Sequence, residues 1–239
     1  MVSTSTFERY LDSLLKGDRN LCKTIIEEML HTGMPANSVY INIIWPIMVE
    51  IENLHRQDRI SAIQQHLATR INRTIVDQLQ NKLPCKQQKD KKIVICCAQD
   101  ELQELGAQMI ADLFESDGWE VRFCGGGLTN DDILAFVNNY APDILLMYGA
   151  SPKQAPGIRQ LIDTIRNVNA WPNMKIMLSG GLFNRAEGLW DEIGADLFAA
   201  TAQEALEVAS KDIFLPSTDL KRNTACRRKK AKVTSSLRS

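Results

Sequence analysis

Three segments of the chain combine glycine with polar side chains that could contact a ligand. Their sequences are Glu101-x-Gln103-x-x-Gly106, Gly149-Ala-Ser151 and Ser179-Gly180-Gly181. Glycine lets a ligand approach the backbone closely, because it carries no Cβ atom. Carboxamide, carboxylate and hydroxyl groups supply the hydrogen bonds that orient a bound molecule. These residue types indicate a binding site that is built from three turns.

Metal ligation would have to use the histidines, and all of these lie in the N-terminal helical part, at positions 31, 55 and 66. Neutral imidazole is a common metal ligand, so His55 and His66 are candidate axial ligands. The alternative for each is an ordinary interface residue, and His31 receives no site role. No Ser-His-Asp or Cys-His arrangement and no nucleophile motif accompanies them. We therefore expect a protein that is not an enzyme.

The glycine-containing segments each follow or end an apolar run, which predicts strands that lead into turns. Strands are predicted at Lys92–Ala98, Glu120–Phe123, Ile144–Tyr148, Lys175–Ser179 and Leu197–Ala199, and helices at about Leu102–Asp117, Asp131–Tyr140, Pro156–Val168, Ala186–Ile193 and Gln203–Ile213. Such alternation predicts an α/β fold with a mostly parallel, doubly wound sheet. Ligands bind to these sheets at the carboxyl ends of the strands. All three segments should therefore meet at one edge.

The first part of the chain, residues 1–86, is predicted to form a cap of four helices. Apolar residues recur there with helical spacing, and Asp18 and Ser61 are suited to cap the second and fourth helices. Pro35 would begin the third helix. That helix is expected to run to about His55, with a kink or a division at Pro46.

Charge is distributed unevenly along the chain. Residues 217–239 carry a formal charge of +7, whereas the rest of the chain carries −8. We expect residues 87–214 to form the α/β domain and residues 215–239 a disordered basic tail. Such a tail could contact nucleic acid non-specifically or bind a regulatory partner protein. No apolar run approaches the ~20 residues that span a bilayer, so a cytoplasmic protein without membrane contact is expected. A homo-oligomer is a separate expectation.

The order of helical bundle, polar linker and α/β domain resembles the cobalamin-binding modules of corrinoid methyltransfer proteins, methionine synthase and light-responsive transcriptional regulators. The best-matching stretches are Ile44–Ile51 with Ile60–Ala68, then Glu120–Leu128, Pro142–Tyr148, and Met177–Phe183 with Ile193–Asp196. The resemblance covers about residues 1–214. It implies a four-helix cap followed by a flavodoxin-like, five-stranded parallel α/β domain, with cobalamin bound between them.

The resemblance also implies a set of site residues, several of which differ from the family pattern. Glu101 and Gly106 keep the family residues, but the histidine below cobalt aligns with Gln103, and the serine at the nucleotide loop aligns with Tyr148. A carboxamide oxygen is a weak, neutral metal ligand. The cofactor-binding residues that follow are Glu101, Gln103, Gly106, Tyr148, Ser179, Gly180 and Gly181 from below, with His55, Gln65 and, as a possible metal ligand, His66 from above.

Three functions are compatible with this pattern. The first hypothesis is a sensory or regulatory protein that binds cobalamin, or a related tetrapyrrole such as haem, and controls a partner or transcription. The second is a corrinoid carrier in methyl transfer, which needs a tuned cobalt centre. The third is a scaffold without ligand, in which the Tyr148 ring fills the vacated nucleotide slot. A flavin or a bilin is a further alternative ligand.

Overall fold

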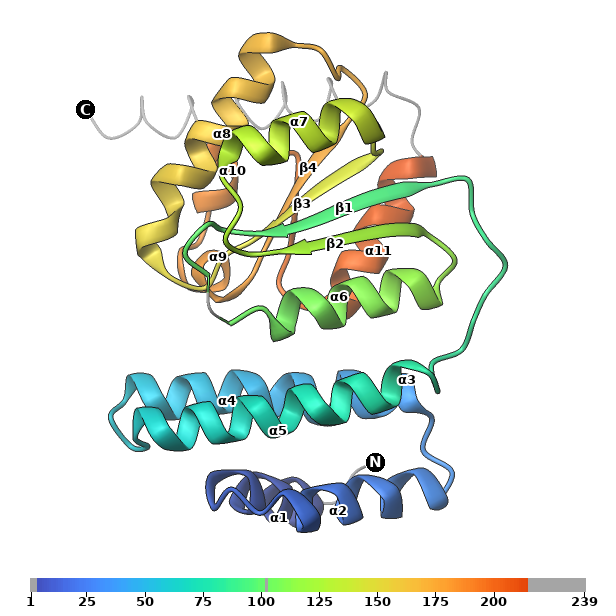
Figure 1. The fold of residues 1–239 in the computed structure, drawn as a ribbon, viewed down its shortest axis with the longest axis vertical. Helices are drawn as coiled ribbons and strands as arrows, with labels where there is room; N and C mark the ends of the chain where they lie inside the picture. Colours follow the sequence, from blue (N-terminus) through green and yellow to red (C-terminus); the bar gives the residue numbers. More distant parts are fainter. Residues whose placement is uncertain (1–3, 102, 215–239) are drawn as a thin grey trace, which may run out of the picture.

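A computed structural model describes residues 4–101 and 103–214, which form a helical cap beneath an α/β domain (Figure 1). The cap consists of α1 (Thr4–Leu15), α2 (Arg19–His31), α3 (Ala36–Val39), the π-helix η1 (Tyr40–Ile44), α4 (Trp45–Arg56) and α5 (Ala62–Gln80). The α4–α5 pair lies between the α1–α2 pair and the α/β domain. These two helices therefore form the surface on which the α/β domain rests. The basic tail predicted for residues 215–239 lies outside the described residues.

The α/β domain confirms the predicted fold class. Its strands are β1 (Lys92–Cys97), β2 (Glu120–Gly125), β3 (Ile144–Tyr148), β4 (Lys175–Ser179) and β5 (Leu197–Ala199), and its helices are α6 (Leu105–Ser116), α7 (Asn130–Tyr140), η2 (Pro152–Gln154), α8 (Ala155–Val168), α9 (Gly181–Arg185), α10 (Leu189–Ile193) and α11 (Ala202–Phe214). All strand pairs are parallel, in the order β2-β1-β3-β4-β5. This is the flavodoxin-like order, in which ligands bind at the carboxyl edge.

Two apolar cores follow from the alternation of side chains along each strand. On β1, Ile93, Ile95 and Cys97 face α6 and α11, and they belong to a buried cluster that continues into the cap helices. Val94 and Cys96 face the opposite side, where they pack with residues of α7 and α8. The cap and the α/β domain therefore share one continuous apolar core.

The third cap helix and the segment after β4 differ from their predicted forms. The predicted helix between Pro35 and His55 is divided into α3, η1 and α4, and Pro46 lies in the first turn of α4. Proline lacks the N–H that an uninterrupted α-helix needs, and the wider π-turn accommodates its absence. The helix predicted at Ala186–Ile193 is replaced by the short helices α9 and α10. The caps at Asp18 and Ser61 are confirmed.

A buried polar contact joins the cap to α6. Tyr40 Oη lies 2.9 Å from a carboxylate oxygen of Asp112 and 2.9 Å from the carbonyl oxygen of Val76. Burial raises the pKa of Asp112 to about 6, against the opposing effect of the Tyr40 hydrogen bond, and the Glu115 and Asp77 carboxylates raise it further. Asp112 therefore binds its proton more tightly in the folded chain than in the unfolded chain.

We expect the protein to become more stable as the pH falls from 7 to 5. A carboxyl with a folded pKa of about 6 contributes stability that is fully present below its unfolded pKa and is lost as the pH rises through 6. In Asp112→Asn, the change in the free energy of unfolding between these pH values should be smaller by about 1 kcal/mol. Urea denaturation at both pH values measures this, and an equal pH dependence in the two proteins would contradict it.

Candidate functional site

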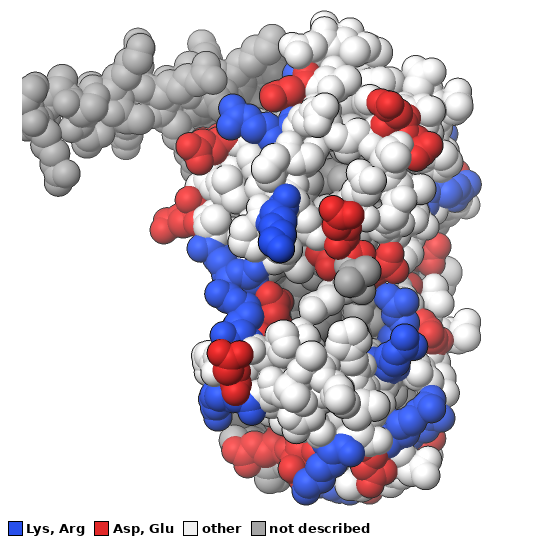
Figure 2. Space-filling model, turned by 60° about the vertical axis from the view of Figure 1, so that its left-hand side comes forward, with Lys and Arg blue, Asp and Glu red and all other residues white. Residues whose placement is uncertain are grey.

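A cleft separates the cap from the carboxyl edge of the sheet. Its cavity volume is about 90 Å³, and it reaches about 800 Å³ only when the open space at its mouth is included. Figure 2 shows the molecule hollowed between its cap half and its α/β half. The lining residues are Trp45, Met48, Val49, Ile51, Glu52, Asn53, Gln65, Thr69 and Asn72 from the cap, with Gln103, Leu105, Tyr148, Gly180, Gly181, Asn184 and Arg185 from the α/β domain.

The turns after β3 and β4 form part of the floor of the cleft and pack directly on each other. Gly180 has φ +106°, and a Cβ atom there would lie 2.3 Å from the carbonyl oxygen of Gly149. Only glycine fits this position. Ser179 is fully buried and donates a hydrogen bond to the carbonyl oxygen of Ala199. Ser179 therefore joins β4 to β5 and does not line the cleft, in contrast to its predicted contact with the ligand.

Tyr148, the last residue of β3, closes the floor beneath the cleft. Its ring lies against Gly106 of α6, where a Cβ atom would meet Tyr148 Oη at 2.3 Å. Burial raises the pKa of the Tyr148 hydroxyl far above its usual value, and the Glu101 and Glu52 carboxylates act in the same direction. Tyr148 is therefore neutral, and its ring occupies the space between β3 and α6.

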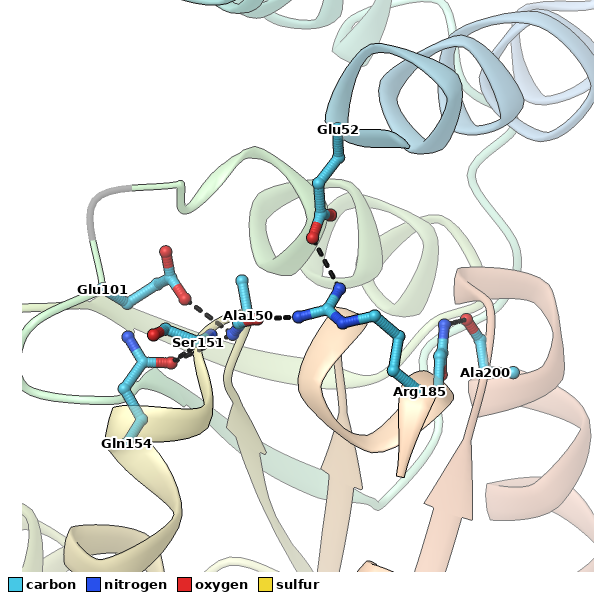
Figure 3. A network of polar contacts seen from close by, with 8 residues as sticks. Glu52, Glu101, Ala150, Ser151, Gln154, Arg185 and Ala200 are labelled. Atoms are coloured by element: carbon cyan, nitrogen blue, oxygen red, sulfur yellow. Dashed lines mark hydrogen bonds and ion pairs between the residues drawn. The ribbon is translucent and has the colours of Figure 1, made fainter. Parts of the chain in front are cut away.

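Glu101 holds the turns together instead of facing the cleft. Its buried carboxylate accepts hydrogen bonds from the backbone N–H of Gln103 at 2.7 Å and of Ala150 at 2.8 Å. Figure 3 shows Glu101 and Gln154 converging on the turn after β3 from two sides. Gln154 accepts from the N–H groups of Ala150 and Ser151, each at 3.0 Å. Glu101 is thus a positioning residue, and Gln103 is the member of its turn that lines the cleft.

The structure brings only some of the predicted cap residues to the site. Gln65 is buried and lines the cleft, whereas His66 is exposed and lines a groove that adjoins it. His55 is half-buried near the end of α4 and lines neither space. Within the described residues, no three His, Cys, Asp or Glu side chains gather as a metal site would require. The axial-ligand role of His66 stays a prediction.

Two features of the cleft were missed by sequence reasoning. Asn72 is 1% exposed, and its Oδ1 accepts a hydrogen bond from Tyr10 at 2.8 Å, but its Nδ2 has no partner in the described structure. Arg185 pairs with Glu52 of the cap at 2.6 Å and also donates to the carbonyl oxygen of Ala150 (Figure 3). The polar stripe formed by Gln65, Thr69 and Asn72 on one face of α5 was the signal that could have identified Asn72.

Replacing Gly106 by alanine should destabilise the fold by about 1–3 kcal/mol, the usual cost of overpacking a core. The added methyl group would overlap the Tyr148 ring. Gly157→Ala in α8 is the matched control, because a Cβ atom there meets nothing within 4 Å. Urea denaturation of both variants measures the difference. A Gly106→Ala protein as stable as the wild type would mean that the Tyr148 ring moves aside freely.

The chain matches two family models, and both describe a B12 binding domain. One covers residues 91–210 and the other residues 6–80. A corrinoid protein of Desulfitobacterium hafniense is 27% identical over 50% of this chain, and the match spans only 55% of that relative. Monomethylamine corrinoid protein 2 of Methanosarcina acetivorans is 20% identical over 87% of this chain and 98% of its own length.

Two solved structures share the fold. The monomethylamine corrinoid protein of Methanosarcina barkeri superposes with a TM-score of 0.79 at 17% identity, over 87% of this chain and 98% of that chain. The methanol:cobalamin methyltransferase complex of the same organism gives a TM-score of 0.51 at 11% identity, over 93% and 85% of the two chains. Within the described part of the chain, none of the helices has the length and apolar character that a bilayer span requires.

Proposed function

The chain belongs to the B12 binding domain family and is a corrinoid-binding protein, and we propose that it carries a methyl group on its bound corrinoid between partner proteins. The names of its relatives, monomethylamine and dimethylamine corrinoid proteins, support this function. The same relatives give no support to the sensory function that we placed first from the sequence. They do support the carrier function that we held as its alternative.

The residues that line the cleft are suited to a corrin ring. A corrin is a flat macrocycle edged with amide groups, so it needs a slot with apolar walls and a few hydrogen-bond donors. Trp45, Met48 and Val49 supply an apolar roof, and Gly180 and Gly181 supply a part of the floor that carries no side chains. The buried Nδ2 of Asn72 is a donor without a partner in the described structure. When bound, a corrinoid supplies a cobalt centre that can accept and release a methyl group.

The chain's own residues would orient the ring and control access to it. Glu52 of the cap and Arg185 of the α/β domain form an ion pair directly over Gly181. A ring seated on the Gly180–Gly181 turn would have to displace this pair. The apolar residues of α4 would then exclude water from the upper face. The cap therefore acts as a lid over the cleft. The Glu52–Arg185 ion pair, called the latch below, holds this lid closed and breaks when the cleft is filled.

The unpartnered amide of Asn72 is the observation that carries the proposal most directly. A buried donor without an acceptor is unfavourable, and a ligand amide carbonyl would satisfy it. Asn72→Ala should weaken binding of hydroxocobalamin about fivefold to tenfold, the value of one neutral hydrogen bond. Titration of the full-length protein, followed by its visible spectrum, measures this affinity.

Tyr10→Phe is the control for Asn72→Ala. It removes the hydrogen bond between Tyr10 and Asn72 but leaves the Asn72 amide in the cleft. Its affinity for hydroxocobalamin should match that of the wild type. Failure of the wild-type protein to retain hydroxocobalamin through gel filtration would overturn the proposal as a whole.

A ligand-responsive sensor is the second candidate, and the Glu52–Arg185 latch favours it. Enzyme-dependent methyl release separates the two functions. The protein is loaded with methylcobalamin and mixed with homocysteine, with and without a corrinoid-dependent methyltransferase that uses homocysteine as the acceptor. A carrier should lose about one methyl group per bound cobalt to the thiol when the methyltransferase is present. A sensor should keep its methyl group in both mixtures.

A further inference from the structure

A second groove opens beside the cleft along α5. It is lined by Gln65, His66, Thr69, Arg70, Arg73, Gln103 and Glu104, and it encloses about 930 Å³ including its open mouth. Gln65, Thr69 and Gln103 line both spaces. The groove is therefore continuous with the cleft, and a molecule larger than the cleft could extend into it.

The groove carries the positive charges of two arginines, and the described carboxylates neutralise them only in part. Arg70 and Arg73 lie one helical turn apart on α5. Arg73 is 3.5 Å from Glu104, but that carboxylate also accepts a hydrogen bond from the N–H of Gly126 at 2.6 Å. Arg70 is exposed, and among the described residues its guanidinium has no acidic partner. Two guanidinium groups at this spacing fit a phosphate group, because arginine presents several donors in a plane.

The described residues below the cleft pack closely against one another. The Tyr148 ring lies on Gly106, and Glu101 ties the turn before α6 to the turn after β3. An extended group attached to the underside of a corrin could therefore not pass between β3 and α6 unless Tyr148 moved. The groove along α5 is the open route out of the cleft.

Resting on the proposed function, we propose that the α5 groove receives the nucleotide tail of cobalamin. Cobalamin is a corrin joined to a benzimidazole nucleotide through one phosphodiester. Arg70 and Arg73 bind this phosphodiester, and the nucleotide stays outside the α/β domain. The corrin then lies in the cleft above Tyr148, and the two parts of the ligand occupy two connected sites.

Comparing hydroxocobalamin with diaquocobinamide, which lacks the nucleotide and its phosphodiester, tests this assignment. Arg70→Gln in the full-length protein should weaken hydroxocobalamin binding about tenfold, as expected for a lost charge-assisted contact. The same variant should bind diaquocobinamide as the wild type does. Arg59→Gln is the matched control, because this exposed arginine precedes α5 and lines neither space. The affinity of the wild type for hydroxocobalamin should also fall more steeply with rising salt than that of Arg70→Gln.

Several outcomes would overturn the assignment. One is an equal loss of affinity for both ligands in Arg70→Gln, and another is no loss for either. A third is a Tyr148→Ser protein that gains affinity for hydroxocobalamin while Arg70→Gln has no effect, since the tail would then lie below the floor. Binding of diaquocobinamide distinguishes failure of the groove assignment from failure of the proposed function. A chain that holds no corrinoid would bind neither diaquocobinamide nor hydroxocobalamin.

Discussion

The contact between Tyr148 and Gly106 determines the shape of the site. A phenol ring at the end of β3 can lie against α6 only because the residue beneath it has no side chain. Once this pair is packed, the carboxyl edge of the sheet has a closed floor. The cleft then lies above the sheet edge, between the cap helices and the turns of the α/β domain. The Tyr148–Gly106 contact therefore sets the lower boundary of the cleft.

The cap and the α/β domain are joined by two kinds of contact with different consequences. The shared apolar core and the buried Tyr40–Asp112 pair fix the cap on α6. The Glu52–Arg185 pair lies at the cleft and is partly exposed, so it is the weaker link. A ligand can therefore displace the latch without separating the cap from the domain. This arrangement suits a carrier that must expose its ligand to partners and keep its fold.

The sequence predicted the fold well because strand runs, turns and caps are local signals. The caps at Asp18 and Ser61 and the parallel character of the sheet were predicted from residue type and spacing. The flavodoxin-like strand order was implied by the resemblance to cobalamin-binding modules. The roles of individual site residues were less predictable, because they depend on contacts between distant segments. Glu101 accepts a hydrogen bond from the turn after β3, and Ser179 donates one from β4 to β5. Arg185 donates a hydrogen bond to Glu52 of the cap, 133 positions away. Asn72 was not predicted, because its burial and its hydrogen bond to Tyr10 depend on the packing of α5 against α1.

Anomalous diffraction at the cobalt edge, from crystals of the full-length protein grown with hydroxocobalamin, tests the central claim most directly. We expect one cobalt peak between α4–α5 and the Gly180–Gly181 turn, with the Tyr148 ring still against Gly106. The density for the nucleotide tail should run along α5. A cobalt peak outside the cleft, or a tail inserted between β3 and α6 with Tyr148 displaced, would contradict the claim.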